Sequence, residues 1–412
     1  MRIPVLAVLV CCAAAADQPR IVGCEEAVRS PKRGLCANKL GAEDFTVLAP
    51  GVSWFYNWHF TTDMAPPAEL GFAFIPMVWG DFPEAYPGLE KRLAASPKPP
   101  VVFAINEPNL KGQAFITPEV CAAAFKRVQG IAAKHGVPVV GPHYALGSSP
   151  ADSITAMDPL EKKQVTYSWF VPYMKAFGHF LGPAAKGLPT GVHAYKDLGE
   201  LTWSIQAAYE ATGGPVWVSE FARWDADERG QLEFMMQAVD LMERTPHVAG
   251  YAWFKERADH GTLALLAKEP GKLTALGRAY VDMPVHDPHL YYLVPGLLQA
   301  ERYVEAAKEV RLVPAAEGGV LADMIVPMDG WLEYNMAAAK AGPHGLELRL
   351  SGNPGTIIAT CGGAEVGRIE VADGKGWRTA AGRITLPAGT STVRLRITGA
   401  GARIDSLRWS AP

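Results

Sequence analysis

Val101-Val102-Phe103-Ala104-Ile105-Asn106-Glu107-Pro108-Asn109 is the segment that sets the pattern of this fold. Five apolar residues, Val101–Ile105, are followed at once by an amide, a carboxylate and a proline. A short apolar run with such an ending is typical of a buried strand in a parallel sheet. The polar residues then lie at the carboxyl end of the strand, where parallel sheets carry their functional groups.

The same pattern recurs on both sides of this segment. Seven further apolar runs predict strands at Gly34–Ala37, Val52–Tyr56, Ala73–Met77, Val137–Val140, Gly191–His193, Val216–Ser219 and Gly250–Trp253. Helical stretches separate most of them, such as Pro118–His135, which Thr117 can cap, and Gly230–Thr245. Eight strands that alternate with helices over about 250 residues predict an α/β fold, the (β/α)8 or TIM barrel. A doubly wound open sheet is the main alternative, but no glycine-rich phosphate loop follows any strand.

The 412-residue chain is longer than one average domain, and its texture changes near residue 285. Beyond that point apolar and polar residues alternate between glycines, as in Gly345–Leu350 and Thr392–Ile397, which indicates an all-β module. We expect a barrel domain over residues 17–284, a proline-bracketed linker over 285–289 and a β-sandwich over 290–412.

The chain begins with an apolar stretch, Ile3–Ala16, that follows Arg2 and ends in three alanines. These features are typical of a signal peptide, which we place at residues 1–16. The stretch is shorter than the roughly 20 residues that span a bilayer, and no later run reaches that length. We therefore expect a secreted protein, extracellular or cell-wall associated, without a membrane partner. A lipid anchor at Cys11 or Cys12 is the alternative, which the bulky residues before them disfavour.

Charge and cysteine content limit the partners, disulfides and metal sites that we expect. The net charge is −3, so the positive charge that nucleic-acid binding requires is missing, and we expect no nucleic-acid partner. Beyond the signal peptide the cysteines are Cys24, Cys36, Cys121 and Cys361. An oxidising compartment permits a Cys24–Cys36 disulfide, whereas Cys36 and Cys121 can instead be buried core residues, the preferred interpretation for Cys121. No Cys-x-x-Cys pair or His/Cys cluster indicates zinc.

Functional residues of a barrel lie at the carboxyl ends of its strands. Two predicted strands end in a glutamate, Glu107 after the fourth and Glu220 after the seventh. These strands lie across the barrel mouth from each other, so their carboxyls can face one another over a substrate. Opposed carboxyls are the arrangement of a glycosidase, in which one protonates the leaving oxygen and the other attacks the sugar carbon. Asn106 can then hydrogen-bond the sugar 2-hydroxyl.

Aromatic and histidine side chains at other strand ends complete the predicted site. Sugar rings carry C–H groups that stack on aromatic faces, which favours tryptophans and tyrosines at the rim. The candidate substrate-binding residues are Tyr56, Trp58, Trp79, His143, His193, Tyr195 and Trp253. Either histidine can instead be a hydrogen-bonded structural residue, and His193 can also tune the attacking carboxylate. For Trp54, Trp203 and Trp217, core packing is the preferred interpretation.

Seven segments stand out when read in order between residues 32 and 256. They are Lys32–Leu35, Tyr56–Trp58, Ile75–Gly80, Asn106–Asn109, His193–Tyr195, Ser219–Phe221 and Tyr251–Phe254. Together they resemble glycoside hydrolase family 128. An Asn-Glu-Pro tripeptide is shared by many retaining barrel glycosidases, and the Met-x-Trp-Gly and Tyr-Asn-Trp segments sharpen the resemblance. It implies a secreted, retaining β-1,3-glucanase without a catalytic cofactor, with Glu107 as general acid/base and Glu220 as nucleophile.

The C-terminal module resembles the galactose-binding-like β-sandwiches, or jelly rolls, and in particular family 6 carbohydrate-binding modules. The matching segments are Leu298–Tyr303, Asp329–Tyr334, Gly376–Trp377, Leu386–Thr390 and Ile404–Asp405. This resemblance implies a structural calcium ion held by Gln299, Glu301 and Asp405, and a sugar-stacking role for Trp377. The alternative is a sandwich that only packs on the barrel.

The resulting hypothesis is a monomeric, endo-acting β-1,3-glucanase whose partner is a β-glucan polysaccharide or oligosaccharide. One alternative is a catalytically silent glucan-binding or cell-wall protein. The presence of both carboxylates and of Asn106 disfavours it. The other alternative is a retaining glycosidase that acts on a β-1,4-linked glucan or mannan.

Overall fold

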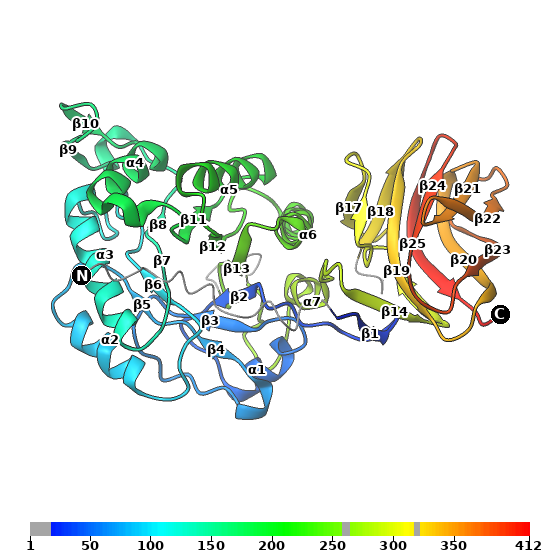
Figure 1. The fold of residues 1–412 in the computed structure, drawn as a ribbon, viewed down its shortest axis with the longest axis horizontal. Coiled ribbons are helices and arrows are strands. Elements are labelled where there is room, and N and C mark those ends of the chain that lie inside the picture. The colour runs from blue at the N-terminus through cyan, green and yellow to red at the C-terminus, as the bar shows by residue number, and fades with distance from the viewer. Residues whose placement is uncertain (1–17, 258–263, 317–321) are drawn as a thin grey trace, which may run out of the picture. The chain divides into compact units, whose positions relative to one another are not determined.

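The computed structural model describes residues 18–257, 264–316 and 322–412, so the predicted signal peptide at residues 1–16 lies outside the described residues (Figure 1). The chain divides into two compact units. The larger unit is Ala27–Met283, and the smaller one combines the described residues up to Glu26 with those from Pro284 onward. Within the described ranges, no helix is long and apolar enough to cross a membrane.

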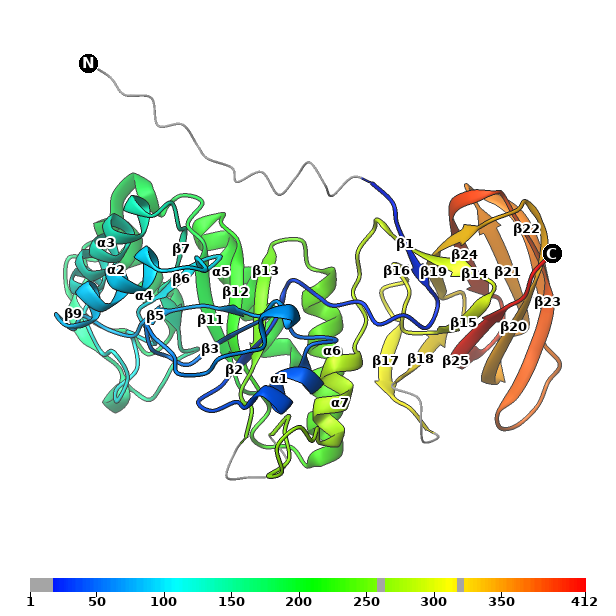
Figure 2. The same cartoon turned by 90° about the horizontal axis from the view of Figure 1, so that it is seen from below.

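The larger unit is an α/β structure in which strands and helices alternate along the chain (Figure 2). Its parallel strands are β2 (Arg33–Cys36), β3 (Trp54–Tyr56), β4 (Ala73–Phe74), β5 (Met77–Val78), β6 (Val102–Ala104), β7 (Val139–Val140), β8 (His143–Tyr144), β11 (Thr190–Ala194), β12 (Val216–Phe221) and β13 (Val248–Trp253). Among the described residues they form a seven-stranded sheet, β4-β3-β2-β13-β12-β11-β8, and a three-stranded sheet, β5-β6-β7. Every predicted apolar run overlaps at least one of these strands, so the predicted α/β class is confirmed. The unit also holds an antiparallel hairpin of β9 (Thr155–Met157) and β10 (Gln164–Thr166).

The helices follow the strands as the sequence pattern predicts. They are α1 (Ala42–Leu48), α2 (Ala85–Ala94), α3 (Pro118–Lys134), α4 (Phe170–Leu181), α5 (Leu198–Thr212), α6 (Glu228–Arg244) and α7 (Ala275–Asp282), with short 3-10 turns η1 (Ala68–Leu70), η2 (Pro150–Asp152) and η3 (Gly182–Ala185). Thr117 caps α3 by accepting a hydrogen bond from the backbone N–H of Val120. Asp197 caps α5 in the same way through the N–H of Glu200.

Two segments of the chain contribute to both sheets, and a proline interrupts each of them. Pro76 lies between β4 and β5, and Pro142 lies between β7 and β8. Proline has no N–H to donate, so the ladder is interrupted where it occurs. Its carbonyl still pairs, because the N–H of Phe103 donates to the carbonyl of Pro76 (2.9 Å). Segments 73–78 and 139–144 thus each contribute a strand to both sheets.

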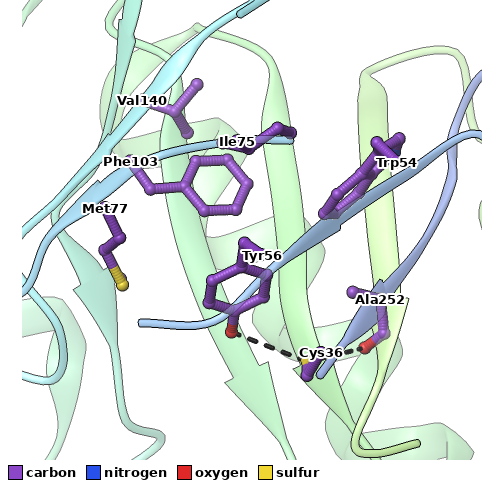
Figure 3. Close-up of a cluster of buried hydrophobic side chains, with 8 residues drawn as sticks. All are labelled: Cys36, Trp54, Tyr56, Ile75, Met77, Phe103, Val140 and Ala252. Atoms are coloured by element: carbon purple, nitrogen blue, oxygen red, sulfur yellow. Dashed lines mark hydrogen bonds between the residues drawn. The ribbon is translucent and has the colours of Figure 1, made fainter. Parts of the chain in front are cut away.

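Apolar side chains from several strands meet in one buried cluster (Figure 3). The cluster contains Cys36, Trp54, Tyr56, Ile75, Met77, Phe103, Val140 and Ala252. The rings of Trp54 and Phe103 meet edge to face, with centroids 5.8 Å apart, a favourable aromatic geometry. Trp54 is therefore the core residue that the sequence predicts, and Trp217 packs against the same cluster.

The cysteines of the described residues are free. The Cys24–Cys36 disulfide that an oxidising compartment would permit is not formed, since both thiols are free. Cys24 donates a hydrogen bond to the carbonyl of Leu293 (3.2 Å), and Cys36 donates one to the carbonyl of Ser219 (3.2 Å). Cys121 is buried in α3, as predicted.

The smaller unit is built from strands throughout its described residues. They are β1 (Arg20–Gly23), β14 (Leu290–Val294), β15 (Gly296–Gln299), β16 (Glu305–Ala306), β17 (Arg311–Pro314), β18 (Ala322–Pro327), β19 (Trp331–Ala338), β20 (Gly342–Asn353), β21 (Thr356–Cys361), β22 (Ala364–Glu370), β23 (Arg378–Leu386), β24 (Gly389–Ile397) and β25 (Gly401–Trp409). One sheet joins β1, β14, β16, β19, β24, β21 and β22, and the other joins β17, β18, β25, β20, β23 and β15. The predicted all-β texture is confirmed.

The N-terminal boundary differs from the predicted one. β1 pairs in parallel with β14, so that Arg20 lies opposite Leu290. Arg302 also donates hydrogen bonds to the carbonyls of Cys24 (2.9 Å) and Glu26 (2.7 Å). Residues 20–26 therefore belong to the smaller unit rather than to the barrel domain to which the sequence analysis assigned them, because β1 pairs with a strand of the C-terminal sheet.

Candidate active site

The two predicted catalytic glutamates are positioned by β6 and β12. Glu107 follows β6 and has a φ of 41°, in the left-handed region that residues other than glycine rarely adopt. Its backbone N–H donates to the carbonyl of His143 (2.7 Å), which holds this strained turn in place. Glu220 lies within β12 and pairs in register with His193 of β11.

A β-bulge in β12 turns two consecutive side chains into the same buried region. Val192 pairs with Val218, but His193 pairs with Glu220, so Ser219 is an extra residue in β12. In a regular strand Ser219 and Glu220 would point to opposite faces of the sheet. Here Oγ of Ser219 lies 3.1 Å from Nε2 of His193, and Oε2 of Glu220 lies 3.5 Å from Nδ1 of the same ring.

His193 lies between the two carboxylates. Its Nδ1 is 2.8 Å from Oε1 of Glu107, and one side-chain atom from each of Glu107, His193 and Glu220 lies within 4.8 Å of the other two. Burial alone would lower the pKa of His193, but the negative charges of Glu220 and Glu107 outweigh burial and raise that pKa above its ordinary value. The two glutamates that contact His193 therefore favour the charged form of its imidazole.

Three neutral donors converge on Glu220. Oη of Tyr56 (3.0 Å) and Nε1 of Trp58 (2.7 Å) both donate to Oε1. Oη of Tyr195 donates to Oε2. Donors fixed by the surrounding strands orient a carboxylate and stabilise its negative charge. Tyr56 is fully buried, so it acts on Glu220 rather than on substrate, which corrects its predicted substrate-binding role.

His143 lies behind this cluster rather than in the cleft. It is fully buried, and its Nδ1 lies 2.6 Å from Oγ of Ser219, which also contacts His193. Burial lowers the pKa of His143 well below its ordinary value, and the charge of His193 lowers it further. The predicted substrate-binding role of His143 is thus corrected to the structural alternative, because a neutral ring without solvent access can only hold its neighbours.

The carboxylates open on a cleft of about 620 Å³. Of the predicted substrate-binding residues, Asn106, Trp58, Trp79 and Tyr195 line it. Residues that the sequence reasoning did not identify also line it, among them Asn38, Gln113, Glu200, Trp224 and Phe254. Trp224 and Phe254 each follow a strand end closely, which is the signal that could have found them.

The sequence predicted Trp253 at the rim of the site, but this residue lies in the core. It is fully buried at the end of β13, and its ring meets that of Phe221 edge to face at 5.1 Å. The next residue, Phe254, lines the cleft instead. Successive side chains of a strand alternate between faces, so an error of one residue exchanges core and cleft.

Asn106 lines the cleft with its amide oriented by a neighbour. Its Nδ2 donates to Oε1 of Gln113 (3.0 Å). Its Oδ1 is buried and has no hydrogen-bond partner among the described residues. A buried acceptor without a partner is unfavourable unless a ligand supplies the donor. The geometry therefore suits a substrate hydroxyl.

The family described as Glycosyl hydrolase catalytic core matches residues 34–280 of the 412. A solved glycoside hydrolase family 128 (subgroup II) endo-β-1,3-glucanase from Pseudomonas viridiflava is 30% identical, with a TM-score of 0.53, and the match covers 63% of this chain and 100% of that one. The chain belongs to glycoside hydrolase family 128. A second subgroup II endo-β-1,3-glucanase, from Sorangium cellulosum, is 28% identical over 62% of this chain and 99% of that one, with a TM-score of 0.52. No curated protein sequence gives a significant match.

The chain is thus a glycoside hydrolase, and Glu107, His193 and Glu220 lie inside the matched region. These three residues also offer ligand atoms at a spacing that a metal ion could use. Both ring nitrogens of His193 already have hydrogen-bond partners, however, in Glu107 and Ser219. A metal would have to displace these contacts, so the cluster of the family 128 enzyme fits proton transfer better than metal binding.

The predicted calcium ligands lie together in the smaller unit, outside the family match. Gln299 ends β15, which pairs with β25, the strand that contains Asp405. Oε1 of Gln299 and Oε2 of Glu301 are buried without a hydrogen-bond partner among the described residues. Burial, with a smaller contribution from Asp405 and Asp323, raises the pKa of Glu301 to about 8. Buried carboxylate and amide oxygens without hydrogen-bond partners are ligand types that a hard cation prefers.

Trp377 of the smaller unit precedes β23 and is half-buried. The guanidinium of Arg349 lies 5.5 Å from the centre of its ring. A cation over an aromatic face is a stabilising contact in its own right. Trp377 thus has a packing role in this unit.

We expect the Trp58→Phe variant to lose catalytic rate because it removes the indole N–H that donates to Glu220 but keeps an aromatic ring in the cleft. A hydrogen bond to a charged group is worth enough to lower kcat/KM by about 10- to 100-fold. Steady-state kinetics on a glucan substrate would measure the change. Trp79→Phe is the matched control, because Trp79 lines the same cleft but no hydrogen bond joins it to Glu220. Equal losses in the two variants would contradict the assigned role of the N–H.

We expect the His193→Gln variant to change how stability depends on pH. The pKa of His193 is raised above its ordinary value of 6.5, so the stability it contributes is fully present below that pH and is lost as the pH rises through the folded-state pKa. The free-energy difference of unfolding between intact enzyme and variant should therefore shrink with rising pH, as denaturant titrations would show.

His143→Gln is the internal control for this measurement. The pKa of His143 is lowered, so the intact enzyme loses stability through this residue as the pH falls, which is the opposite slope. The same slope in both variants would contradict the assigned charge states.

Proposed function

We propose that this enzyme is a retaining glycoside hydrolase that cleaves β-1,3-linked glucan by double displacement. The observation that carries the proposal is the separation of the carboxylates: one oxygen of Glu107 and one of Glu220 lie within 4.8 Å of each other and of His193. An inverting pair needs about 6.5–9.5 Å so that a water fits beside the sugar, whereas a retaining pair lies about 5–5.5 Å apart. The short separation favours direct attack by one carboxylate on the sugar carbon.

The surroundings of the two carboxylates support different roles. Glu220 accepts hydrogen bonds from Tyr56, Trp58 and Tyr195, which suits an ionised nucleophile that must aim one oxygen at the anomeric carbon. Glu107 takes one contact from His193, so it can gain and release a proton as the acid/base. In the first step Glu220 bonds to the sugar carbon while Glu107 protonates the leaving oxygen. In the second step Glu107 removes a proton from water, which displaces Glu220.

Substrate linkage and endo action are proposed from the relatives and the cleft. Both structural relatives above are endo-β-1,3-glucanases. The cleft offers aromatic faces from Trp58, Trp79 and Trp224 to sugar rings. The unpaired Oδ1 of Asn106 is placed to accept a hydrogen bond from the 2-hydroxyl. A β-1,4-linked glucan or mannan is the alternative substrate.

We further infer that the two sheets of the larger unit close into a (β/α)8 barrel. Segments 73–78 and 139–144 each take part in both sheets, and all strand pairs of these two sheets are parallel. In such a barrel β6 and β12 come from opposite sides, which supports a site built between their carboxyl ends.

We expect Glu220→Gln and Glu107→Gln each to lose turnover on linear β-1,3-glucan, by about 100-fold or more, while thermal unfolding stays cooperative. Glu200→Gln is the matched control, because Glu200 is a third carboxylate of the same cleft. Product chromatography would follow oligosaccharide release, and NMR would show whether the first sugars formed keep the β configuration.

Activity that survives in Glu220→Gln, or an initial α product, would overturn the double-displacement proposal. Release from cellulose or mannan in place of β-1,3-glucan would move the assignment to a β-1,4 glycosidase. Binding without any release would favour a glucan-binding protein.

For the smaller unit we propose a galactose-binding-like sandwich that holds a structural calcium ion. We also propose that the protein is exported from the cell. Gln299, Glu301 and Asp405 would hold the ion, and Gln299 and Glu301 present buried oxygens that lack partners. The ion would supply positive charge that keeps Glu301 ionised at neutral pH, and so removes the penalty of burying its carboxylate.

We expect calcium to change the pH dependence of stability in this unit. Without a cation the pKa of Glu301 is raised from 4.5 to about 8. The contribution of Glu301 to stability is therefore fully present below pH 4.5 and is lost as the pH rises toward 8. Added calcium should raise the melting temperature most at the upper end of this range, and chelation should reverse the gain.

Glu301→Gln should abolish both the pH slope and the calcium response, whereas the exposed Glu305→Gln should keep both. A calcium response that persists in Glu301→Gln would refute the assigned ligand.

A further inference from the structure

Two tryptophans of the larger unit stack on each other at the surface. Trp169 and Trp203 are 45% and 42% exposed, and their ring centroids lie 5.6 Å apart with an angle of 28° between the planes. Trp203 was expected in the core, and its exposure corrects that expectation. Large aromatic side chains that gather at a surface usually mark a binding site, since water is a poor environment for their faces.

Trp169 is attached directly to the wall of the catalytic cleft. It forms an antiparallel bridge with Gly147, which lines the cleft together with Ala145 and Leu146. A Cβ at Gly147 would come within 2.3 Å of the carbonyl oxygen of Ser168, so only glycine allows this close approach. The backbone therefore fixes Trp169 beside the cleft.

Trp203 is attached to the same cleft through α5. Glu200, which lines the cleft, lies three residues before Trp203 on this helix. Residues three apart on a helix are surface neighbours, so Trp203 lies next to the cleft wall. The ring of Phe170 meets Trp203 edge to face at 5.4 Å and fixes its orientation. Both tryptophans are thus held next to residues that line the cleft.

We propose that Trp169 and Trp203 form a distal binding platform for a β-glucan chain that extends beyond the catalytic cleft. Pyranose rings present C–H faces that stack on such a platform, and a polysaccharide is the ligand that reaches both the platform and the carboxylates at once. The inference rests on the proposed function, because it requires a polymeric glucan substrate. Multiple contacts along one chain raise its apparent affinity, whereas a short oligosaccharide that fills only the cleft gains nothing.

The test compares long and short substrates in the full-length enzyme. Trp169→Ala, Trp203→Ala and the double variant are assayed on linear β-1,3-glucan and on a β-1,3-linked trisaccharide. The double variant should lose about tenfold in kcat/KM on the polymer, mainly through KM, and change less than about twofold on the trisaccharide. In gel electrophoresis through dissolved β-1,3-glucan, it should be retarded less than the intact enzyme.

The matched control is Tyr209→Ala. Tyr209 is a 38% exposed aromatic residue on the same helix, stacked on His247 rather than on another exposed ring. It should leave both substrates unaffected, and thermal unfolding verifies that each variant is folded.

Equal losses on polymer and trisaccharide would overturn the platform, because they would indicate a structural effect on the cleft. An unchanged polymer KM and unchanged retardation would overturn it as well. In both cases the intact enzyme still hydrolyses β-1,3-glucan, so the proposed function stands. An intact enzyme that neither hydrolyses nor binds this glucan would overturn both.

Discussion

The contact of His193 with two carboxylates is the interaction on which the rest of the active site depends. Two buried carboxylates at this separation repel strongly unless positive charge lies between them. The pKa of His193 is raised because both glutamates favour the charged form of its ring, despite burial. The histidine must also be held still, and Ser219 and the neutral His143 do so from behind. Ser219 thus joins an imidazole whose pKa is raised, that of His193, to one whose pKa is lowered, that of His143.

The bulge in β12 is the backbone feature that makes this arrangement possible. It places Ser219 and Glu220, which are adjacent in sequence, against the same histidine. Without the extra residue, one of the two would point away from His193. On the opposite side, the strained turn at Glu107 is held by a hydrogen bond to the backbone of β8. Both predicted catalytic glutamates therefore depend on irregular backbone, which is where strain at functional sites is often found.

Sequence reasoning predicted the strands and the two carboxylates because both depend on local patterns. Short apolar runs that end in Glu107 or Glu220 can be recognised without knowledge of the rest of the chain. The predicted rim position of Trp253 was wrong by one residue. Side chains of a strand alternate between two faces, so misplacing the strand end by one residue exchanges core and cleft. The Cys24–Cys36 disulfide is absent for a different reason. β1 pairs with β14, and local sequence patterns cannot reveal a contact between residues so far apart in the sequence.

The residues that sequence reasoning missed lie mostly outside the strands, and this follows from how the site is built. Trp224 and Trp169 lie on connections, where neither periodicity nor burial predicts the direction of a side chain. Strands hold the side chains of the site to within a hydrogen-bond length, as precise chemistry requires. Connections tolerate change, so they suit the contacts that we propose for a longer glucan chain. The two glutamates of the site could therefore be recognised from the sequence, whereas the aromatic surface beside them could be found only from the fold.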